Sequence, residues 1–330
     1  MSRSARSAVT RREFVCASGL VAGGLVGLSA AASSAGTVPQ VVLGRTNARV
    51  SRLGIGCAPL QRPHVTQRDI EELFHTALEC GVNYLDVAPN YGNERTGFSE
   101  EKMGPVVKRI RDQVFLVTKT EEPTYEGTWR LLRQSLRRLQ TDYLDLVHLH
   151  NLGHEPRFPD LDLVFSERGA LGALLEAKEK GVVRFIGASG HLYPSRFHAA
   201  LDTGKIDVLM NAVNFVAQHV YDFENKVWSR ARQMNIGLVA MKVLGGAGRN
   251  QKGFRLPKEL YESAIRYALS ITGVHVAVIG MESVQELRQA VEVVRRFKPL
   301  SDDERHELAL LGLKLAGTPE WRTPYGKPTL

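Results

Sequence analysis

The feature that most constrains the fold is an alternation, repeated eight times, between a short apolar run and a longer helical pattern. The predicted strands are Leu53–Cys57, Tyr84–Val87, Val114–Thr118, Leu144–His150, Val182–Ala188, Val208–Val213, Gly237–Met241 and Val274–Ile279. The predicted helices are 67–80, 99–109, 126–139, 170–180, 194–202, 222–235, 258–271 and 283–296. Parallel strands need crossover helices and bury both faces, so eight such units predict an α/β fold, a closed (β/α)8 TIM barrel.

Other segments fit around this barrel. Gly81, Gly181 and Gly273 stand where helices should end, as C-cap glycines do. Val41–Val50 predicts an N-terminal β-hairpin that closes the bottom of the barrel, and a last helix is expected over 301–313. An open doubly wound sheet is the alternative, but no Gly-x-Gly-x-x-Gly follows the first strand.

The first 35 residues follow the order of an export signal: four Arg, then an apolar run of small residues, then small residues before a cleavage point after Ala35. The run is shorter than the roughly 20 residues of a membrane-spanning helix. Arg11 and Arg12, followed by Glu13, resemble the twin-arginine (Tat) motif, whose machinery exports folded proteins. We therefore expect a signal peptide over 1–35 and one domain over 36–330. A Sec signal or an uncleaved membrane anchor is the alternative.

This leader predicts the partner and the location. The Tat export machinery is the expected partner, and the mature protein is expected in the periplasm or secreted, with no stable membrane insertion after cleavage. Cleavage removes four Arg and one Glu, and so leaves a net charge of +5 from the full chain's +8. That modest charge, without a basic run interleaved with aromatics, argues against nucleic-acid binding. Three Cys without a Cys-x-x-Cys exclude a disulfide framework and a zinc ribbon.

Polar side chains follow several of the predicted strands. Asp86 ends the second strand and Tyr91 lies five residues later, Lys119 ends the third, and His150 ends the fourth. Reacting groups of such barrels stand at the carboxyl ends of strands, so we expect these side chains to converge at one mouth. Each alone has a plain structural explanation, but an acid, a phenol, an ammonium and an imidazole together favour a shared site.

This set of groups is suited to delivering a proton to a carbonyl oxygen. An unperturbed phenol, with a pKa near 10, is a poor acid at neutral pH. We expect the Lys119 ammonium to lower the pKa of Tyr91, Asp86 to hold Lys119, and His150 to orient the carbonyl. Proton donation alone is not a reaction, and no nucleophile with its base is recognisable. A hydride source, and hence a nicotinamide cofactor, is implied.

Four motifs in order resemble the aldo-keto reductase superfamily, from Val41 to about Lys298. They are Asp86-x-Ala-x-x-Tyr91-Gly, Leu-Val-Thr-Lys119, Asp145-Leu-x-x-Leu-His150 and Val183-Arg-Phe-Ile-Gly-Ala-Ser189. The resemblance implies reduction of an aldehyde or ketone, or the reverse reaction, with NADP(H) or NAD(H) and without a metal. It also implies that Tyr91 is the general acid, that Lys119 and Asp86 tune its pKa, and that His150 orients the substrate.

The resemblance also implies a cofactor site. Its expected residues are Ser189, Asn211, Met241, Lys242, Leu244, Gly245, Gly280, Met281, Ser283 and Arg288. Gly190 replaces the Asn that usually follows the serine. The family's Gln falls on Met210 or Asn211, of which Asn211 has suitable chemistry. Met241 stands where an aromatic residue often stacks on the nicotinamide, and it is an adequate soft platform.

The region expected to hold the adenosine 2′-phosphate lacks the usual cations. Met281 and Glu286 occupy the positions that resemble the family's Lys and Arg. Arg288 lies one turn further along, and Lys242, Arg249, Lys252 and Arg255 are candidates to clamp the pyrophosphate. We therefore expect weaker discrimination between NADPH and NADH than is usual in the family.

Two alternatives from other classes remain at this point. His148 and His150, with His191 and His219, predict a metal site in an amidohydrolase-like barrel, although such barrels carry the pair on their first strand. A cofactor-binding regulatory homologue with little turnover is the second alternative, and the intact Asp86, Tyr91, Lys119 and His150 argue against it. The sequence does not identify the physiological substrate.

Overall fold

The computed structural model describes residues 36–245, 255–318 and 321. Eight parallel strands close into a barrel in the order β10-β11-β12-β3-β4-β7-β8-β9, as predicted. The barrel strands are β3 (Leu53–Gly56), β4 (Tyr84–Asp86), β7 (Phe115–Thr120), β8 (Leu144–His150), β9 (Val183–Gly190), β10 (Val208–Ala212), β11 (Gly237–Met241) and β12 (Val276–Gly280). The predicted leader, residues 1–35, lies outside the described residues.

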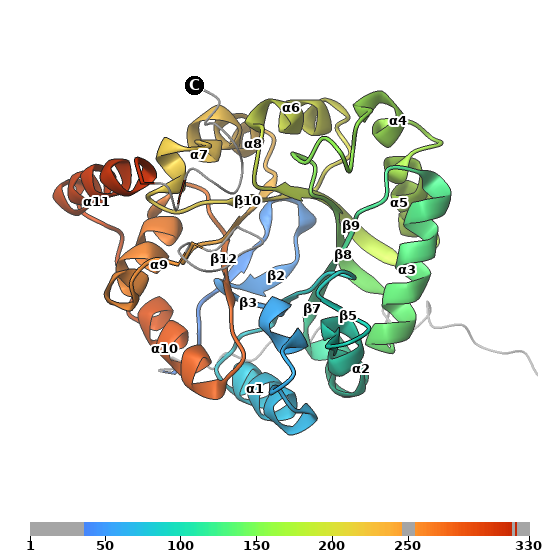
Figure 1. Ribbon diagram of the computed structural model, residues 1–330, viewed down its shortest axis with the longest axis horizontal. Helices are drawn as coiled ribbons and strands as arrows, with labels where there is room; N and C mark the ends of the chain where they lie inside the picture. Colours follow the sequence, from blue (N-terminus) through green and yellow to red (C-terminus); the bar gives the residue numbers. More distant parts are fainter. Residues whose placement is uncertain (1–35, 246–254, 319–320, 322–330) are drawn as a thin grey trace, which may run out of the picture. The chain divides into compact units, whose positions relative to one another are not determined.

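Helices surround the strands (Figure 1). They are α1 (Gln67–Glu79), α2 (Ser99–Ile110), α3 (Tyr125–Leu139), α4 (Leu161–Phe165), α5 (Ala170–Glu179), α6 (Pro194–Asp202), α7 (Phe223–Lys226), α8 (Trp228–Gln233), α9 (Tyr261–Ser270), α10 (Val284–Arg295) and α11 (Asp302–Ala316). The segment 222–235, predicted as one helix, is two short helices that meet at the buried Val227, whose φ is −125°. No helix within the described residues is both long and apolar enough to cross a membrane.

Helix ends follow the capping chemistry of the sequence. Thr66 forms a reciprocal capping box with Asp69 at the start of α1, and Ser301 forms one with Glu304 at the start of α11. The three glycines predicted to end helices have left-handed backbone, with φ of 77° at Gly81, 72° at Gly181 and 83° at Gly273.

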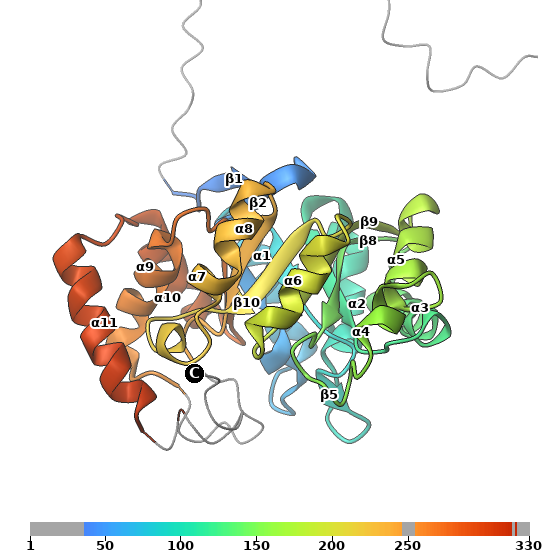
Figure 2. The same ribbon diagram turned by 90° about the horizontal axis from the view of Figure 1, so that it is seen from above.

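The predicted hairpin closes the N-terminal end of the barrel. Strands β1 (Gln40–Val42) and β2 (Arg49–Ser51) pair antiparallel, and Figure 2 shows them at the opposite end from β5 (Gly92–Asn93). Between them, Leu43 is fully buried in the inner apolar cluster of the barrel. The Gly44 N–H donates to His275 Nε2 at 3.2 Å. The barrel is therefore packed at this end and accessible at the other.

The inner face of the barrel is apolar below its mouth. Tyr84 stacks on Phe115 with ring centroids 5.4 Å apart, and Phe115 stacks on Phe185 at 6.2 Å. Met210 points into this cluster, whereas the next residue, Asn211, accepts a hydrogen bond from Trp228 Nε1 of α8 at 2.9 Å. Successive residues of a strand face opposite sides, so Met210 faces the inside of the barrel and Asn211 faces the surrounding helices. The inner apolar cluster supports the polar residues at the strand ends.

Candidate active site

The four predicted catalytic residues meet at the carboxyl end of the barrel. Asp86, Lys119 and His150 end or nearly end neighbouring strands β4, β7 and β8, and each is at least 90% buried. The Lys119 ammonium lies at the centre of the group. It donates to Asp86 Oδ1 at 2.8 Å and Oδ2 at 2.9 Å, and to the Val87 carbonyl at 2.7 Å.

Tyr91 lies on a loop that is fastened at both ends. Its hydroxyl is 3.3 Å from Lys119 Nζ, and its carbonyl accepts from the Ser99 N–H at 2.8 Å. The loop forms a two-residue antiparallel ladder between β5 and β6 (Gly97–Phe98). Gly92 has a φ of 118°, and a Cβ there would lie 2.0 Å from the Gly97 carbonyl oxygen. Only glycine fits this turn, which points the phenol at Lys119.

Burial and charge act in opposite directions on these groups. Burial raises the pKa of Tyr91 more than the Lys119 ammonium lowers it, so the net shift is upward. The Lys119 ammonium lowers the phenol pKa as expected, but desolvation of the phenolate, which the sequence did not reveal, is the larger effect. Burial also opposes the charge on Lys119, but Asp86 and Tyr91 overcome it and raise the Lys119 pKa. Lys119 is thus a stable cation, and Tyr91 holds its proton.

The imidazole of His150 is fixed and neutral. Its Nδ1 shares a hydrogen bond of 2.9 Å with Ser189 Oγ. Burial, and then the Lys119 charge, lower the His150 pKa well below its usual value. The His191 ring stands edge-on to His150 at 5.7 Å, and Asn151 Nδ2 lies 3.1 Å from His191 Nδ1. A neutral imidazole in this position can form a hydrogen bond to a substrate oxygen.

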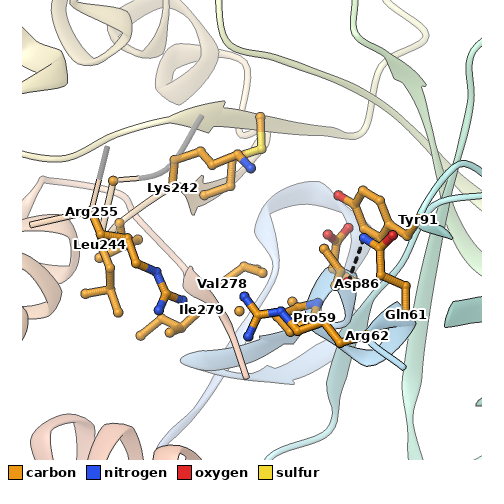
Figure 3. A pocket seen from close by; sticks show the side chains of 16 residues that line it. Pro59, Gln61, Arg62, Asp86, Tyr91, Lys242, Leu244, Arg255, Val278 and Ile279 are labelled. Carbon is orange, nitrogen blue, oxygen red and sulfur yellow. Dashed lines mark hydrogen bonds between the residues drawn. The ribbon is translucent and has the colours of Figure 1, made fainter. Parts of the chain in front are cut away.

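A groove begins at Tyr91 and Asp86 and runs across the mouth. Figure 3 shows these two residues at one end of the first pocket and Leu244 and Arg255 at the other. A second pocket shares Leu244, Arg255, Ile279 and Gly280 with the first and continues to α10. We call these two adjoining pockets together the mouth groove.

Most of the predicted cofactor residues line the mouth groove. Those that do are Met241, Lys242, Leu244, Gly245, Gly280, Met281 and Ser283. Ser189 bonds His150, and neither of these two residues is among those that line the two pockets. Asn211 is not directed at it, since its amide bonds Trp228 and the Gly190 carbonyl. Arg288 is exposed on α10 and is not among the residues that line either pocket. Arg249 and Lys252 lie outside the described residues.

Several groove residues were missed by the sequence analysis. Arg62, in the loop after β3, donates to Glu282 Oε1 at 2.7 Å and so joins the first and last βα loops. Lys258 and Tyr261 line the second pocket opposite α10. The position of Arg62 just after a predicted strand is the one signal that the sequence offered.

The structure gives the metal alternative no geometric support. Among the described residues, no three His, Cys, Asp or Glu side chains are grouped to hold a metal ion. His219 Nε2 bonds the Ala309 carbonyl at 2.9 Å, on the outside of the barrel.

Comparison with known proteins agrees with this geometry. Residues 52–259 match the Aldo/keto reductase family. L-galactose dehydrogenase of Arabidopsis thaliana is 25% identical over 79% of this chain and 90% of its own length. D-arabinose 1-dehydrogenase of Saccharomyces cerevisiae is 26% identical over 74% of this chain and 83% of its own.

A solved structure shows the same architecture. An aldo-keto reductase from Klebsiella pneumoniae in complex with NADPH superposes with a TM-score of 0.68, covering 84% of this chain and 96% of that one at 22% identity. The closed barrel, the groove at its mouth and the match over residues 52–259 lead to one conclusion: the chain belongs to the aldo/keto reductase family.

Proposed function

We propose that the protein reduces an aldehyde or ketone to an alcohol, or catalyses the reverse reaction, with NADP(H) or NAD(H). The observation that carries this proposal is the hydrogen-bonded set of Tyr91, Lys119 and Asp86 at the end of the mouth groove. When bound, the cofactor would supply the hydride. Tyr91 donates its proton to the carbonyl oxygen, Lys119 stabilises the phenolate that results, and neutral His150 orients the carbonyl.

The residues of the mouth groove fit a dinucleotide. Met241 presents a soft apolar side chain near Asp86 and Tyr91, and Lys242, Arg62 and Arg255 supply positive charge further along. Gly280 lies against Pro59, where an added Cβ would come within 3.3 Å of the Pro59 ring. We propose that the nicotinamide half lies in the first pocket and the adenosine half in the second.

The proposed reaction is tested with a panel of carbonyl compounds, following the loss of reduced-nicotinamide absorbance with NADPH and with NADH. The panel includes methylglyoxal and simple aldehydes, and aldoses with oxidised cofactor cover the reverse direction. Aldoses are chosen because L-galactose and D-arabinose dehydrogenases are relatives. We expect turnover of at least one class. Tight cofactor binding without any turnover would instead support a regulatory homologue.

We propose that the protein discriminates weakly between NADPH and NADH. Glu286 Oε2 accepts from the Glu282 N–H at 2.9 Å, and the Glu286 N–H donates to Ser283 Oγ at 3.3 Å. A carboxylate thus covers the N-terminus of α10, where backbone amides would otherwise favour a phosphate. Arg255 and Lys258, which also line the second pocket, are cations and attract a phosphate there. NADPH still binds, but its 2′-phosphate adds little binding free energy relative to NADH.

We propose that the chain is exported through the twin-arginine machinery and acts in the periplasm or outside the cell. Arg11 and Arg12, followed by an apolar run and Ala35, support this proposal. A cofactor that is scarce outside the cytoplasm is best bound before export, which requires a route for folded proteins.

A further inference from the structure

A single carboxylate joins three loops at the mouth of the barrel. Glu121 follows β7, two residues after Lys119. Its Oε1 accepts from Asn90 Nδ2 at 2.5 Å and from Arg157 NH1 at 2.7 Å. Asn90 lies in the loop after β4 and Arg157 in the loop after β8, and both strands are neighbours of β7. One oxygen atom therefore connects the loops that follow three adjacent strands.

On the β4 side, the connection reaches the residue next to the proposed proton donor. Asn90 immediately precedes Tyr91. The bonds described above fasten the Tyr91 loop to itself, through the ladder of β5 and β6, and to Ser99 at the start of α2. Glu121 holds the same loop towards β8 instead. The position of Tyr91 relative to β8 therefore depends on this carboxylate.

On the β8 side, the connection ends in a loop that is itself fixed. The Arg157 N–H donates to the His154 carbonyl at 3.0 Å, and the His154 N–H donates to the Asn151 carbonyl at 2.8 Å. These bonds close two consecutive turns, and Asn151 directly follows His150. Phe158, next to Arg157, is fully buried. The turns and the buried ring hold Arg157 at a fixed place relative to His150.

The pair of Glu121 and Arg157 is shielded and lies close to the reacting groups. The side chain of Glu121 is 14% exposed and that of Arg157 is 28% exposed, so their charge-assisted hydrogen bond is partly protected from water. Burial has the largest effect on the pKa of Tyr91 and of His150. Glu121 adds to the rise at Tyr91, and Arg157 adds to the fall at His150. Neither member of the pair lines the mouth groove.

We propose that Glu121 is a positioning residue that sets the separation of Tyr91 from His150. In the proposed reaction, the carbonyl oxygen must lie within hydrogen-bond reach of both groups, which stand on different elements. Glu121 acts on that separation through Asn90 and Arg157 and not on the substrate itself. This inference rests on the proposed function and adds to it a residue outside the four sequence motifs.

Two substitutions of Glu121 test the connection. Glu121→Ala removes the oxygen that accepts both bonds, and we expect kcat to fall between about 10- and 100-fold with the NADPH dissociation constant unchanged. Glu121→Gln keeps an oxygen that accepts from Asn90 and Arg157, so it should retain kcat within about threefold. Steady-state rates with a carbonyl compound from the panel above and a cofactor titration give the measurement. Equal losses in both variants would overturn the inference.

The adjacent carboxylate provides the matched control. Glu122 Oε1 accepts from Arg130 NH2 at 2.5 Å, and that arginine is exposed on α3. Glu122→Ala therefore removes a similar ion pair from the next residue and should keep its rate. Chemical denaturation of each variant shows how much stability is lost. If Glu122→Ala lost as much rate as Glu121→Ala, the effect would come from general disturbance of the chain after β7, and the inference would be wrong.

A double-variant cycle tests the route through Asn90. Asn90→Ala should lower kcat about tenfold by itself. Glu121→Ala combined with Asn90→Ala should lose no more than Glu121→Ala alone, because both substitutions break the same bond. Losses that multiply would show that the two residues act independently, against the inference.

Failure of this inference differs from failure of the proposed function. Full kcat in Glu121→Ala would overturn the role of Glu121 and leave carbonyl reduction by Tyr91 intact. Absence of turnover by the unaltered protein, with every carbonyl compound and both cofactors, would overturn the proposed function and the role of Glu121 with it.

Discussion

The protonation state of Tyr91 depends on two opposing effects on its pKa, and the larger one is burial of the site. Burial raises the pKa of the phenol, and the Lys119 ammonium at 3.3 Å partly reverses that rise. At neutral pH the phenol is therefore fully protonated before the substrate arrives. In the proposed reaction, the acidity of Tyr91 matters as the carbonyl oxygen gains charge, because Lys119 then stabilises the developing phenolate.

Replacing Tyr91 by Phe removes the proton donor and keeps the ring. We expect kcat for carbonyl reduction to fall by roughly 10²–10⁴, with cofactor affinity nearly unchanged. Steady-state rates and a cofactor titration on the same preparation provide the measurement. Retention of most of the activity would show that another group donates the proton.

Replacing Lys119 by Met tests the cation separately from the fold. The rate should fall about as far as in Tyr91→Phe, because the phenolate loses its ammonium partner. The single change also leaves Asp86 buried without its partner, which typically costs about 3–5 kcal/mol of unfolding free energy. Lys119→Met with Asp86→Asn removes that uncompensated charge.

Chemical denaturation and steady-state rates then separate the two effects. The double variant should recover much of the stability and none of the rate. If the rate recovered together with the stability, Lys119 would have only a structural role.

At the residue scale, the sequence predicted which residues form the candidate site better than it predicted their burial, charge surroundings and backbone conformation. Motif spacing placed Asp86, Tyr91 and Lys119 together, because strand ends of a barrel meet at one mouth. It could not predict the sign of the Tyr91 shift, which depends on burial by distant segments. Nor could it predict the left-handed backbone of Lys242, which depends on Asn214, 28 residues earlier.

Among the elements, α3 has a role beyond covering the barrel. From its last turn, Arg138 NH1 donates to the Pro89 carbonyl at 3.1 Å, and its Nε donates to Glu101 Oε1 at 3.0 Å. The guanidinium lies 3.7 Å from the centre of the Phe98 ring. One side chain thus fastens the loop before Tyr91, strand β6 and the start of α2.

Arg138→Ala should therefore disturb the position of Tyr91 without touching the cofactor. We expect kcat to fall between about 10- and 100-fold, with the NADPH dissociation constant unchanged. Arg137→Ala, which removes an exposed cation from the same helical turn, is the matched control and should keep its rate. An equal effect of both substitutions would trace the loss to α3 itself instead of to the clamp.

The N-terminus of α10 is the part of the structure where we test the preference for NADPH or NADH. We expect the dissociation constants of NADPH and NADH to differ by no more than about tenfold, or about 1.4 kcal/mol. Glu286→Lys should shift the ratio towards NADPH, since it removes a carboxylate and adds a cation. Glu286→Gln separates these two contributions. A thousandfold preference of the unaltered protein for NADPH would mean that the phosphate site lies elsewhere.

Element prediction succeeded where periodicity is strong. Strands β8 and β11 have the predicted bounds, and α6 does as well. The short ladder of β5 and β6 was missed, because two-residue strands carry no alternation of polar and apolar residues. The break between α7 and α8 was missed too, since the helical pattern continues through Val227 and the interruption arises from tertiary packing.

The two ends of the barrel have different roles, one in stability and one in the proposed reaction. The hairpin with Leu43 and Gly44 packs the N-terminal end, and every group of the proposed reaction stands at the other end. Substitutions at the hairpin should change stability, and those at the mouth should change catalysis.

Export concerns the whole chain. Arg11→Lys together with Arg12→Lys should abolish transport of the folded protein and leave it in the cytoplasm as active enzyme. Arg6→Lys, in the same leader but outside the pair, is the control and should be exported normally. Cell fractionation with an activity assay gives the distribution. Normal export of the double variant would exclude the twin-arginine route.

The mouth groove lies over the seam of the barrel. Strand β3, the first of the eight, pairs with β12, the last, and the groove is lined by the loops that follow both. A growing polypeptide has made Tyr91, Lys119 and His150 long before it makes Gly280 and Ser283. On the ribosome, the mouth groove, which we propose as the cofactor site, is therefore incomplete until synthesis is almost finished. Binding of the proposed cofactor therefore stabilises only the closed barrel and not a partly synthesised one.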